Sequence, residues 1–169
     1  LSKMTKEPDN KTWIQQFTQA LDEMVQYVRS LSHSLYPVML EKGDLPAALT
    51  SYFESYQRRT GIKIFFKSRG LEEALPAQIN AVIYRIIQEA LTNVAKHAAA
   101  QNVNVEVNRS KTSVKIHIED DGKGFDATKL LPENSYGITG MKNRALVAGG
   151  SLELYSVPGQ GTSITSILP

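Results

Sequence analysis

Residues 88–98 read QEALTNVAKHA, within a stretch whose apolar residues recur at helical spacing. Glu89, Asn93 and His97 follow one another at intervals of four, which places them along one face of a helix. The other side carries the apolar residues expected to pack on a sheet, namely Val82, Ile86, Ile87, Ala90, Leu91 and Val94. Asn93 offers a neutral oxygen that suits Mg²⁺, and Lys96 and His97 offer donors to phosphates. Each residue alone is better explained as a polar helix edge, but together they predict a metal-phosphate site.

The rest of the chain predicts an α+β domain around this helix, which begins at Pro76 and runs to about Ala99. Two further helices are predicted over 45–59 and 139–148. Alternating or β-branched runs predict five strands, at 62–66, 103–108, 114–119, 152–157 and 163–168. The strands come in adjacent pairs rather than in strict alternation with helices. We therefore expect a two-layer α/β sandwich with a mixed, mostly antiparallel sheet and helices on one face.

A long helix is expected upstream of this domain, after a polar lead-in over residues 1–11. Its apolar stripe consists of Trp13, Phe17, Leu21, Met24, Val28, Leu31 and Leu35. The stripe fits either a surface helix packed on its own domain or a seam with another helix. We assign residues 12–44 to this helix and a linker, and residues 45–169 to the catalytic domain. His33, late in the helix, is interpreted as structural.

Composition excludes several classes of protein. The 169 residues include no cysteine, so thiolate metal sites and disulfides are excluded. A net charge of +2 argues against a nucleic-acid partner. No apolar run approaches the roughly 20 residues that span a bilayer, so a soluble, cytoplasmic domain is expected. The first residue is Leu1 rather than Met, and we expect a piece of a larger protein.

Three glycine-containing motifs follow the long helix. Residues 120–124 read DDGKG, a carboxylate at a strand end followed by glycines that allow a sharp turn and leave room for a flat ligand. Residues 137–141 read GITGM, and glycines before a helix let backbone N–H groups approach a phosphate. A plain loop-to-helix turn explains that motif equally well. Residues 159–162 read GQGT, which alone indicates a hairpin turn.

In this order and spacing, the motifs resemble the GHKL superfamily of ATPases and kinases, which share the Bergerat ATP-binding fold. Residues 88–98 resemble its N box, 120–125 its G1 box, 137–141 its G2 box and 159–162 its closing motif. The resemblance covers about residues 60–169. Only 12 residues separate Gly124 from Gly137, which argues against a long lid.

Upstream residues narrow the resemblance. Residues 30–37 and 45–49 are similar to the end of the dimerisation helix in the NarL-partner branch of sensor histidine kinases, and residues 136–144 also resemble that branch. The resemblance implies transfer of the γ-phosphate of Mg-ATP to a histidine on the dimerisation helix, in a homodimer that signals to a response regulator. No His-Asp pair occurs in the chain, so we expect it to bind ATP without autophosphorylation.

The resemblance also implies residue roles. Asn93 would coordinate Mg²⁺, Asp120 would accept a hydrogen bond from the adenine amino group, and Thr162 would support the same edge. Lys96 and His97 would face phosphates, and the counterpart of Glu89 is a general base in some ATPases of the superfamily. The remaining nucleotide-binding residues would be Gly122, Gly124, Gly137, Gly140 and Met141. Two alternatives stay open: a GHKL serine kinase of the anti-sigma type, and a non-catalytic nucleotide-binding scaffold.

Overall fold

The computed structural model describes residues 40, 44–127 and 136–169, which all belong to one compact unit, Val38–Pro169. The expected seam helix over 12–35, with His33, lies outside the described residues. None of the described helices is both long enough and apolar enough to cross a bilayer.

The described part of the chain contains three α-helices, one π-helical segment and five strands. The helices are α3 (Leu45–Thr60), α4 (Ala77–Asn93) and α5 (Tyr136–Val147), and the π segment η1 (Val94–Ala98) continues directly from α4. The strands are β1 (Lys63–Arg69), β2 (Asn102–Arg109), β3 (Val114–Asp120), β4 (Ser151–Ser156) and β5 (Thr162–Leu168).

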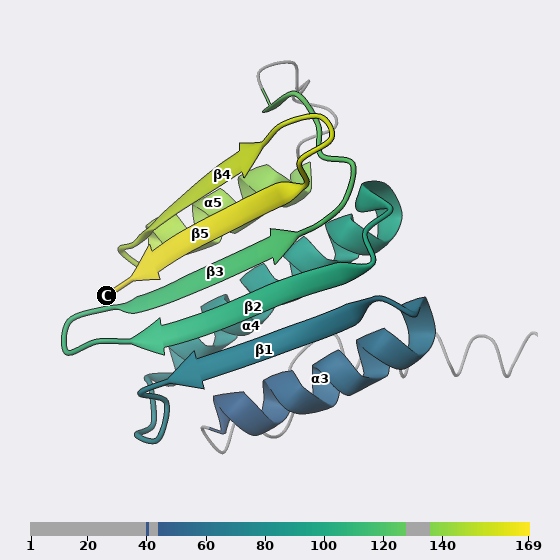
Figure 1. The fold of residues 1–169 in the computed structure, drawn as a ribbon. Coiled ribbons are helices and arrows are strands. Elements are labelled where there is room, and N and C mark those ends of the chain that lie inside the picture. The colour runs from purple at the N-terminus through teal and green to yellow at the C-terminus, as the bar shows by residue number, and fades with distance from the viewer. Residues whose placement is uncertain (1–39, 41–43, 128–135) are drawn as a thin grey trace, which may run out of the picture. The chain divides into compact units, whose positions relative to one another are not determined.

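The strands form one sheet in the order β1-β2-β3-β5-β4. β1 and β2 run parallel because α4 crosses over between them, and the other neighbouring pairs are antiparallel. Figure 1 shows α4 and α5 together behind the sheet. The expected two-layer α+β fold with a mixed, mostly antiparallel sheet is confirmed.

Alternation along the strands decides which face of the sheet is buried. Val103, Val105 and Val107 of β2 are fully buried, whereas Asn104 and Asn108 between and beyond them are exposed. On the same face of β1, the ring of Phe66 packs edge-on against Phe53 of α3, with centroids 5.1 Å apart. The three described helices therefore cover one face of the sheet, and the other face is largely polar.

One row of paired residues crosses the whole sheet at the end where β3 stops and β5 starts. We call it the end row: Ile64, Val103, Asp120, Thr162 and Ser156, contributed by β1, β2, β3, β5 and β4 in turn. The neighbouring row on the same face is entirely apolar and consists of Phe66, Val105, Ile118, Ile164 and Leu154. The core therefore ends in three adjacent polar side chains under the helices, and a buried polar group needs a partner or a ligand.

Several predicted boundaries were wrong. β1 continues to Arg69, beyond the predicted strand end at residue 66, because pairing with β2 extends to that residue. α5 begins at Tyr136, so the glycines of residues 137–141 lie inside the helix and not before it. His117 of β3 is half-buried, with Nδ1 3.0 Å from the hydroxyl of Thr165 on the neighbouring strand.

Candidate functional site

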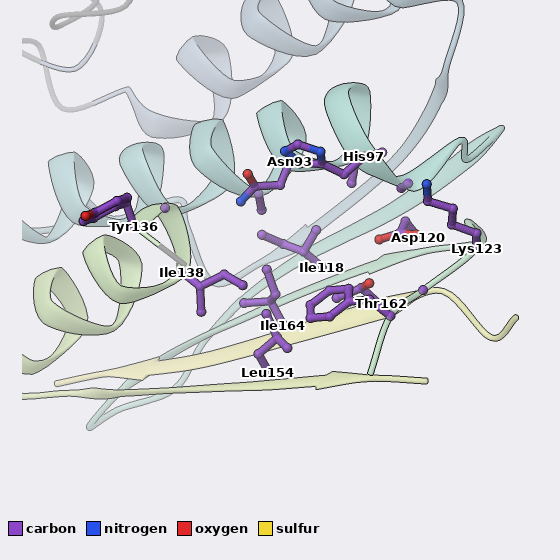
Figure 2. Close-up of a pocket in the computed structure, with 16 residues that line it drawn as sticks. Asn93, His97, Ile118, Asp120, Lys123, Tyr136, Ile138, Leu154, Thr162 and Ile164 are labelled. Carbon is purple, nitrogen blue, oxygen red and sulfur yellow. The ribbon is translucent and has the colours of Figure 1, made fainter. Parts of the chain in front are cut away.

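A cavity of about 560 Å³ lies between the helices and the end row of the sheet. Figure 2 shows Asn93 and His97 above it, Asp120 and Thr162 below, Tyr136 and Ile138 on one side and Lys123 on the other. The apolar lining consists of Ala90, Val94, Ala98, Ile118, Phe125, Ile138, Leu154 and Ile164. An apolar cavity of this size with a few polar groups at defined points is typical of a small-molecule site.

Asp120 forms the polar floor of the cavity together with Thr162, its partner across β3 and β5. Asp120 is only 6% exposed. Its Oδ1 accepts a hydrogen bond of 2.9 Å from the backbone N–H of Gly122, and the backbone of Thr162 also donates to the carboxylate. Burial nevertheless raises the pKa of Asp120, since the ionised form loses water, and the charges of Asp121 and Glu119 act in the same direction. Among the described residues this carboxylate has no ion-pair partner, which favours a ligand that donates hydrogen bonds to it.

The adjacent carboxylate, Asp121, has a structural position. Its Oδ1 accepts from the backbone N–H groups of Gln101 and Asn102 at 2.8 and 2.9 Å, and its Oδ2 accepts from the Asn102 amide at 2.7 Å. These bonds lower the pKa of Asp121. The two neighbouring aspartates therefore have different roles. Asp121 holds the start of β2 against the end of β3, and Asp120 faces the cavity.

The helical side of the cavity contains a change of helix type. The N–H of Val94 is shared between the carbonyls of Ala90 and Leu91, and the chain then continues as the π segment η1. The carbonyl of Leu91 also accepts a hydrogen bond of 3.0 Å from the hydroxyl of Tyr56 on α3. A π segment has a wider turn than an α-helix, so residues four apart stay more nearly in line than α-helical spacing predicts. Asn93 and His97 accordingly line the same cavity.

The residues beside Asn93 fit a partly hydrated Mg²⁺ ion. A Cβ built on Gly137 would contact the Glu89 carboxylate and lie 3.4 Å from the Asn93 amide nitrogen, so the two side chains that carry oxygen ligands lie close together where α4 meets α5. No cluster of three acidic, histidine or cysteine side chains occurs among the described residues. Mg²⁺ takes one or two protein oxygens and completes its shell with waters and phosphate oxygens, so a protein cage is not needed.

We expected the glycines of residues 122–124 to leave room for a flat ligand. In the structure the space beside both glycines is filled by neighbouring backbone, so they allow two segments to pack closely. A Cβ on Gly122 would collide with the carbonyl of Ala98 and with Asp120. Gly124 has φ +56° and lies against the carbonyl of Val157. Lys123 between them donates its N–H to the Ala98 carbonyl at 2.8 Å. Only Gly124 of the two glycines lines the cavity.

The structure brings together six of the predicted site residues. Asn93, His97, Asp120, Gly124, Gly137 and Thr162 all line the cavity. The other predicted residues, Glu89, Lys96, Gly122, Gly140 and Met141, do not. Met141 is fully buried on the inner side of α5 and Lys96 is exposed on η1. Among the described residues, a Cβ on Gly140 would approach the Arg144 guanidinium.

Sequence reasoning missed three polar residues of the site. Lys123 and Tyr136 line the cavity, and both stand inside motifs that were already singled out. Ser156 does not line it but is hydrogen-bonded to Thr162, with 2.9 Å between the two hydroxyl oxygens. In the sequence Ser156 is one small polar residue near a strand end, and only the register of β4 with β5 reveals its position.

Fold and cavity together define a two-layer α+β domain with a cavity of small-molecule size between its helices and the end of its sheet. Residues 79–169 match the family described as histidine kinase-, DNA gyrase B-, and HSP90-like ATPase. The chain belongs to this family of ATP-binding domains. The expectation of a GHKL histidine kinase domain is confirmed.

Similar proteins carry histidine kinase names. The chain is 36% identical over 142 residues to the signal transduction histidine-protein kinase/phosphatase DegS of Brevibacillus brevis, covering 84% of the chain. It is 30% identical over 167 residues to the sensor histidine kinase MctS of Rhizobium johnstonii, covering 98% of the chain. The chain spans 36% of the length of each of these two relatives.

Solved structures show the same fold. The histidine kinase domain of the Erythrobacter litoralis EL346 blue-light activated histidine kinase has a TM-score of 0.59 at 21% identity, over 74% of this chain and 60% of that one. A second structure of that kinase has a TM-score of 0.64 at 19% identity, over 98% of this chain and 64% of that one.

Proposed function

We propose that the chain is the catalytic part of a cytoplasmic sensor histidine kinase, which transfers the γ-phosphate of Mg-ATP to a histidine on a dimerisation helix of the same protein. Relay of the phosphoryl group to a response regulator would follow, and the full-length protein would act as a homodimer. One observation carries the proposal: a single cavity holds a buried carboxylate, Asp120, on the sheet side and an amide oxygen donor, Asn93, on the helix side.

The geometry supports distinct binding of the two ends of ATP. The apolar cavity between Ile118, Ile164 and Leu154 suits a purine ring, and Asp120 would accept a hydrogen bond from its amino group. Asn93 and His97 lie on the opposite wall, where α4 passes into η1, and would face the phosphates. Lys123 extends a cation to the same cavity.

The transfer itself would break the bond between the γ-phosphorus and its bridging oxygen and form a phosphorus–nitrogen bond to an imidazole. ADP leaves with the electron pair of the broken bond, and the imidazole nitrogen loses its proton to solvent or to a basic group. Phosphoryl transfer depends mostly on positioning and on charge stabilisation, so the work of the domain is to hold ATP in line with the histidine.

Asn93, with Glu89 beside it, would hold Mg²⁺ together with phosphate oxygens and waters. The ion, when bound, neutralises charge on the phosphates. The Glu89 carboxylate lies against Gly137 and outside the cavity lining, so a role as general base stays a prediction.

Binding is tested by calorimetric titration of the chain with a non-hydrolysable Mg-ATP analogue. Asp120→Asn exchanges one acceptor oxygen for a donor and should weaken binding about tenfold to a hundredfold, the range for a hydrogen bond to a charged group. Glu119→Gln is the matched control, because this exposed neighbour does not line the cavity. Equal affinities for all three proteins, or no binding by the unaltered chain, would contradict the proposal.

Transfer is tested on the full-length protein with radiolabelled ATP. The label on the protein should be stable in alkali and lost in acid, as a phosphorus–nitrogen bond requires, and Asn93→Ala should abolish it. Binding without any transfer would favour the scaffold alternative, and an acid-stable label would favour the serine kinase alternative.

A further inference from the structure

Ser156 occupies a buried hydrogen-bond junction next to the cavity. Its hydroxyl oxygen lies 2.9 Å from the backbone nitrogen of Phe125, 3.0 Å from the carbonyl oxygen of Gly161 and 2.9 Å from the hydroxyl oxygen of Thr162. Ser156 is 7% exposed, so these three groups leave little room for water.

The number of available protons determines which group donates in each hydrogen bond of this junction. A serine hydroxyl has one proton to donate and can accept two hydrogen bonds. The N–H of Phe125 can only donate and the carbonyl of Gly161 can only accept, so Ser156 accepts from the former and gives its one proton to the latter. The bond between Ser156 and Thr162 then requires Thr162 to be the donor.

The Thr162 hydroxyl consequently has no proton left for the cavity that it lines. Its remaining lone pair makes it an acceptor there, next to the carboxylate of Asp120, its partner across β3 and β5. Both polar groups at the floor therefore accept hydrogen bonds. A purine with an amino group at position 6 donates to such a floor, whereas a carbonyl oxygen at that position would face two acceptors.

We infer that Ser156 is a positioning residue for base selection: it fixes Thr162 as an acceptor and so makes the pocket prefer a 6-amino purine over a 6-oxo purine. The inference rests on the proposed ATP site. Ser156 does not line the cavity, so it acts only through Thr162.

The experiment compares ATP with inosine triphosphate, which carries oxygen in place of the 6-amino group. Both affinities are measured by calorimetry on the chain and on Ser156→Ala. In the variant the Thr162 hydroxyl is free to rotate and to donate to the 6-oxo group. The preference for ATP should fall about threefold to tenfold, chiefly through tighter binding of inosine triphosphate, as expected for one net hydrogen bond.

Ser166→Ala is the matched control. Ser166 is a fully buried serine of the same strand pair, and its hydroxyl donates to the Ser151 carbonyl at 2.8 Å, away from the cavity lining. It should lower the melting temperature while leaving the ratio of the two affinities unchanged. A folded Ser156→Ala protein with the unaltered ratio would overturn the inference, and so would an equal fall in the Ser166→Ala protein.

Two further variants decide the question if Ser156→Ala fails to fold. Thr162→Val removes the acceptor and should reduce the ratio, whereas Thr162→Ser keeps the hydroxyl and should preserve it; an unaltered ratio in Thr162→Val overturns the inference. Failure of the unaltered chain to bind ATP at all would be a different result, because it would refute the proposed function and not the role of Ser156.

Discussion

The hydroxyl of Tyr56 on α3 donates a hydrogen bond of 3.0 Å to the backbone carbonyl of Leu91 on α4. Leu91 lies two residues before Asn93, at the point where regular α-helical bonding ends and the π segment begins. The ring of Tyr52, one turn earlier on α3, lies 5.7 Å from that of Tyr84. α3 is therefore attached to the helix that carries the phosphate side of the proposed site.

Replacing Tyr56 by Phe should lower the free energy of unfolding by about 0.5–1.5 kcal/mol, because it removes one hydrogen bond while the Leu91 carbonyl still accepts from the N–H of Val94. Urea unfolding measures this directly. Tyr155→Phe, at an exposed position on β4, is the control and should be neutral. Equal stability of the two variants would show that the Tyr56 bond contributes nothing.

The two tyrosines of α3, Tyr52 and Tyr56, predict that the folded state loses stability at alkaline pH. Burial raises the pKa of both Tyr52 and Tyr56 to about 12, above the ordinary value of 10.0. Between these values the unfolded chain loses the two protons and the folded chain keeps them, so stability is present below pH 10.0 and is lost as the pH rises toward about 12. In Tyr56→Phe, the decline measured over this range should be smaller than in the unaltered chain.

Asp120 and Asp121 should give opposite effects on stability. Burial raises the pKa of Asp120 above 3.8, so without nucleotide its charge destabilises the folded state as the pH rises through the folded value. The pKa of Asp121 is lowered by its hydrogen bonds, so its contribution is present above 3.8 and is lost as the pH falls through the folded value.

Urea unfolding of Asp120→Asn and Asp121→Asn from pH 3 to pH 7 tests this pair. Relative to the unaltered chain, Asp120→Asn should gain stability and Asp121→Asn should lose it as the pH rises. If the stability of both variants relative to the unaltered chain changed in the same direction with pH, the two carboxylates would not have opposite effects. A stable Asp120→Asn protein that binds ATP weakly would show that the buried charge serves binding at the expense of stability.

Ala99 is the described non-glycine residue with a positive φ, 52°, directly after η1. The left-handed region costs an L-residue about 1–2 kcal/mol, and glycine avoids this cost. Glycine also gives the unfolded chain more conformational freedom, which offsets part of the gain in stability. Ala99→Gly should therefore raise the free energy of unfolding by about 0.5–1 kcal/mol. Ala95→Gly, at an exposed position of right-handed helical backbone in η1, should lower it by a similar amount. Destabilisation by both changes would contradict the left-handed assignment.

Gly137→Ala tests the position of Glu89. The new methyl group would occupy the space of the Glu89 carboxylate, which can swing away at small cost because it ends a flexible side chain. We expect a folded protein whose ATP affinity changes less than its rate of phosphoryl transfer, measured on the full-length protein. Gly140→Ala provides the comparison, since its methyl would meet only the Arg144 guanidinium. A slower transfer in Gly140→Ala alone would restore Gly140 as the glycine that shapes the site.

Local patterns predicted the strands well because their alternation follows from one buried face. In β3, for example, Val114, Ile116 and Ile118 alternate with more polar residues and are buried on one side. Asp120 was found because a carboxylate at a strand end, followed by glycines, stands out in the sequence. Thr162, by contrast, entered only through the family resemblance.

The parts that were missed depend on contacts between distant segments. Tyr56 and Leu91 lie 35 residues apart in the sequence. The spacing of apolar residues predicted a continuous α-helix and gave no sign of the π segment. The position of Ser156 next to the cavity depends on its pairing with Thr162 across the turn between β4 and β5. The start of α5 was placed too late because glycines at 137 and 140 disfavour a helix in isolation, and packing against α4 overrides that preference.

The strand order has a consequence for how the domain is made. β5 follows β4 in the chain yet inserts between β3 and β4, and among the described strands β4 pairs only with β5. A nascent polypeptide leaving the ribosome can join β1, β2 and β3 early, but its end row is incomplete until Thr162 has emerged, and β5 is complete only at residue 168. Ribosome-bound chains that stop short of β5 should therefore be unable to retain nucleotide, so ATP could assist only the final step of folding during synthesis.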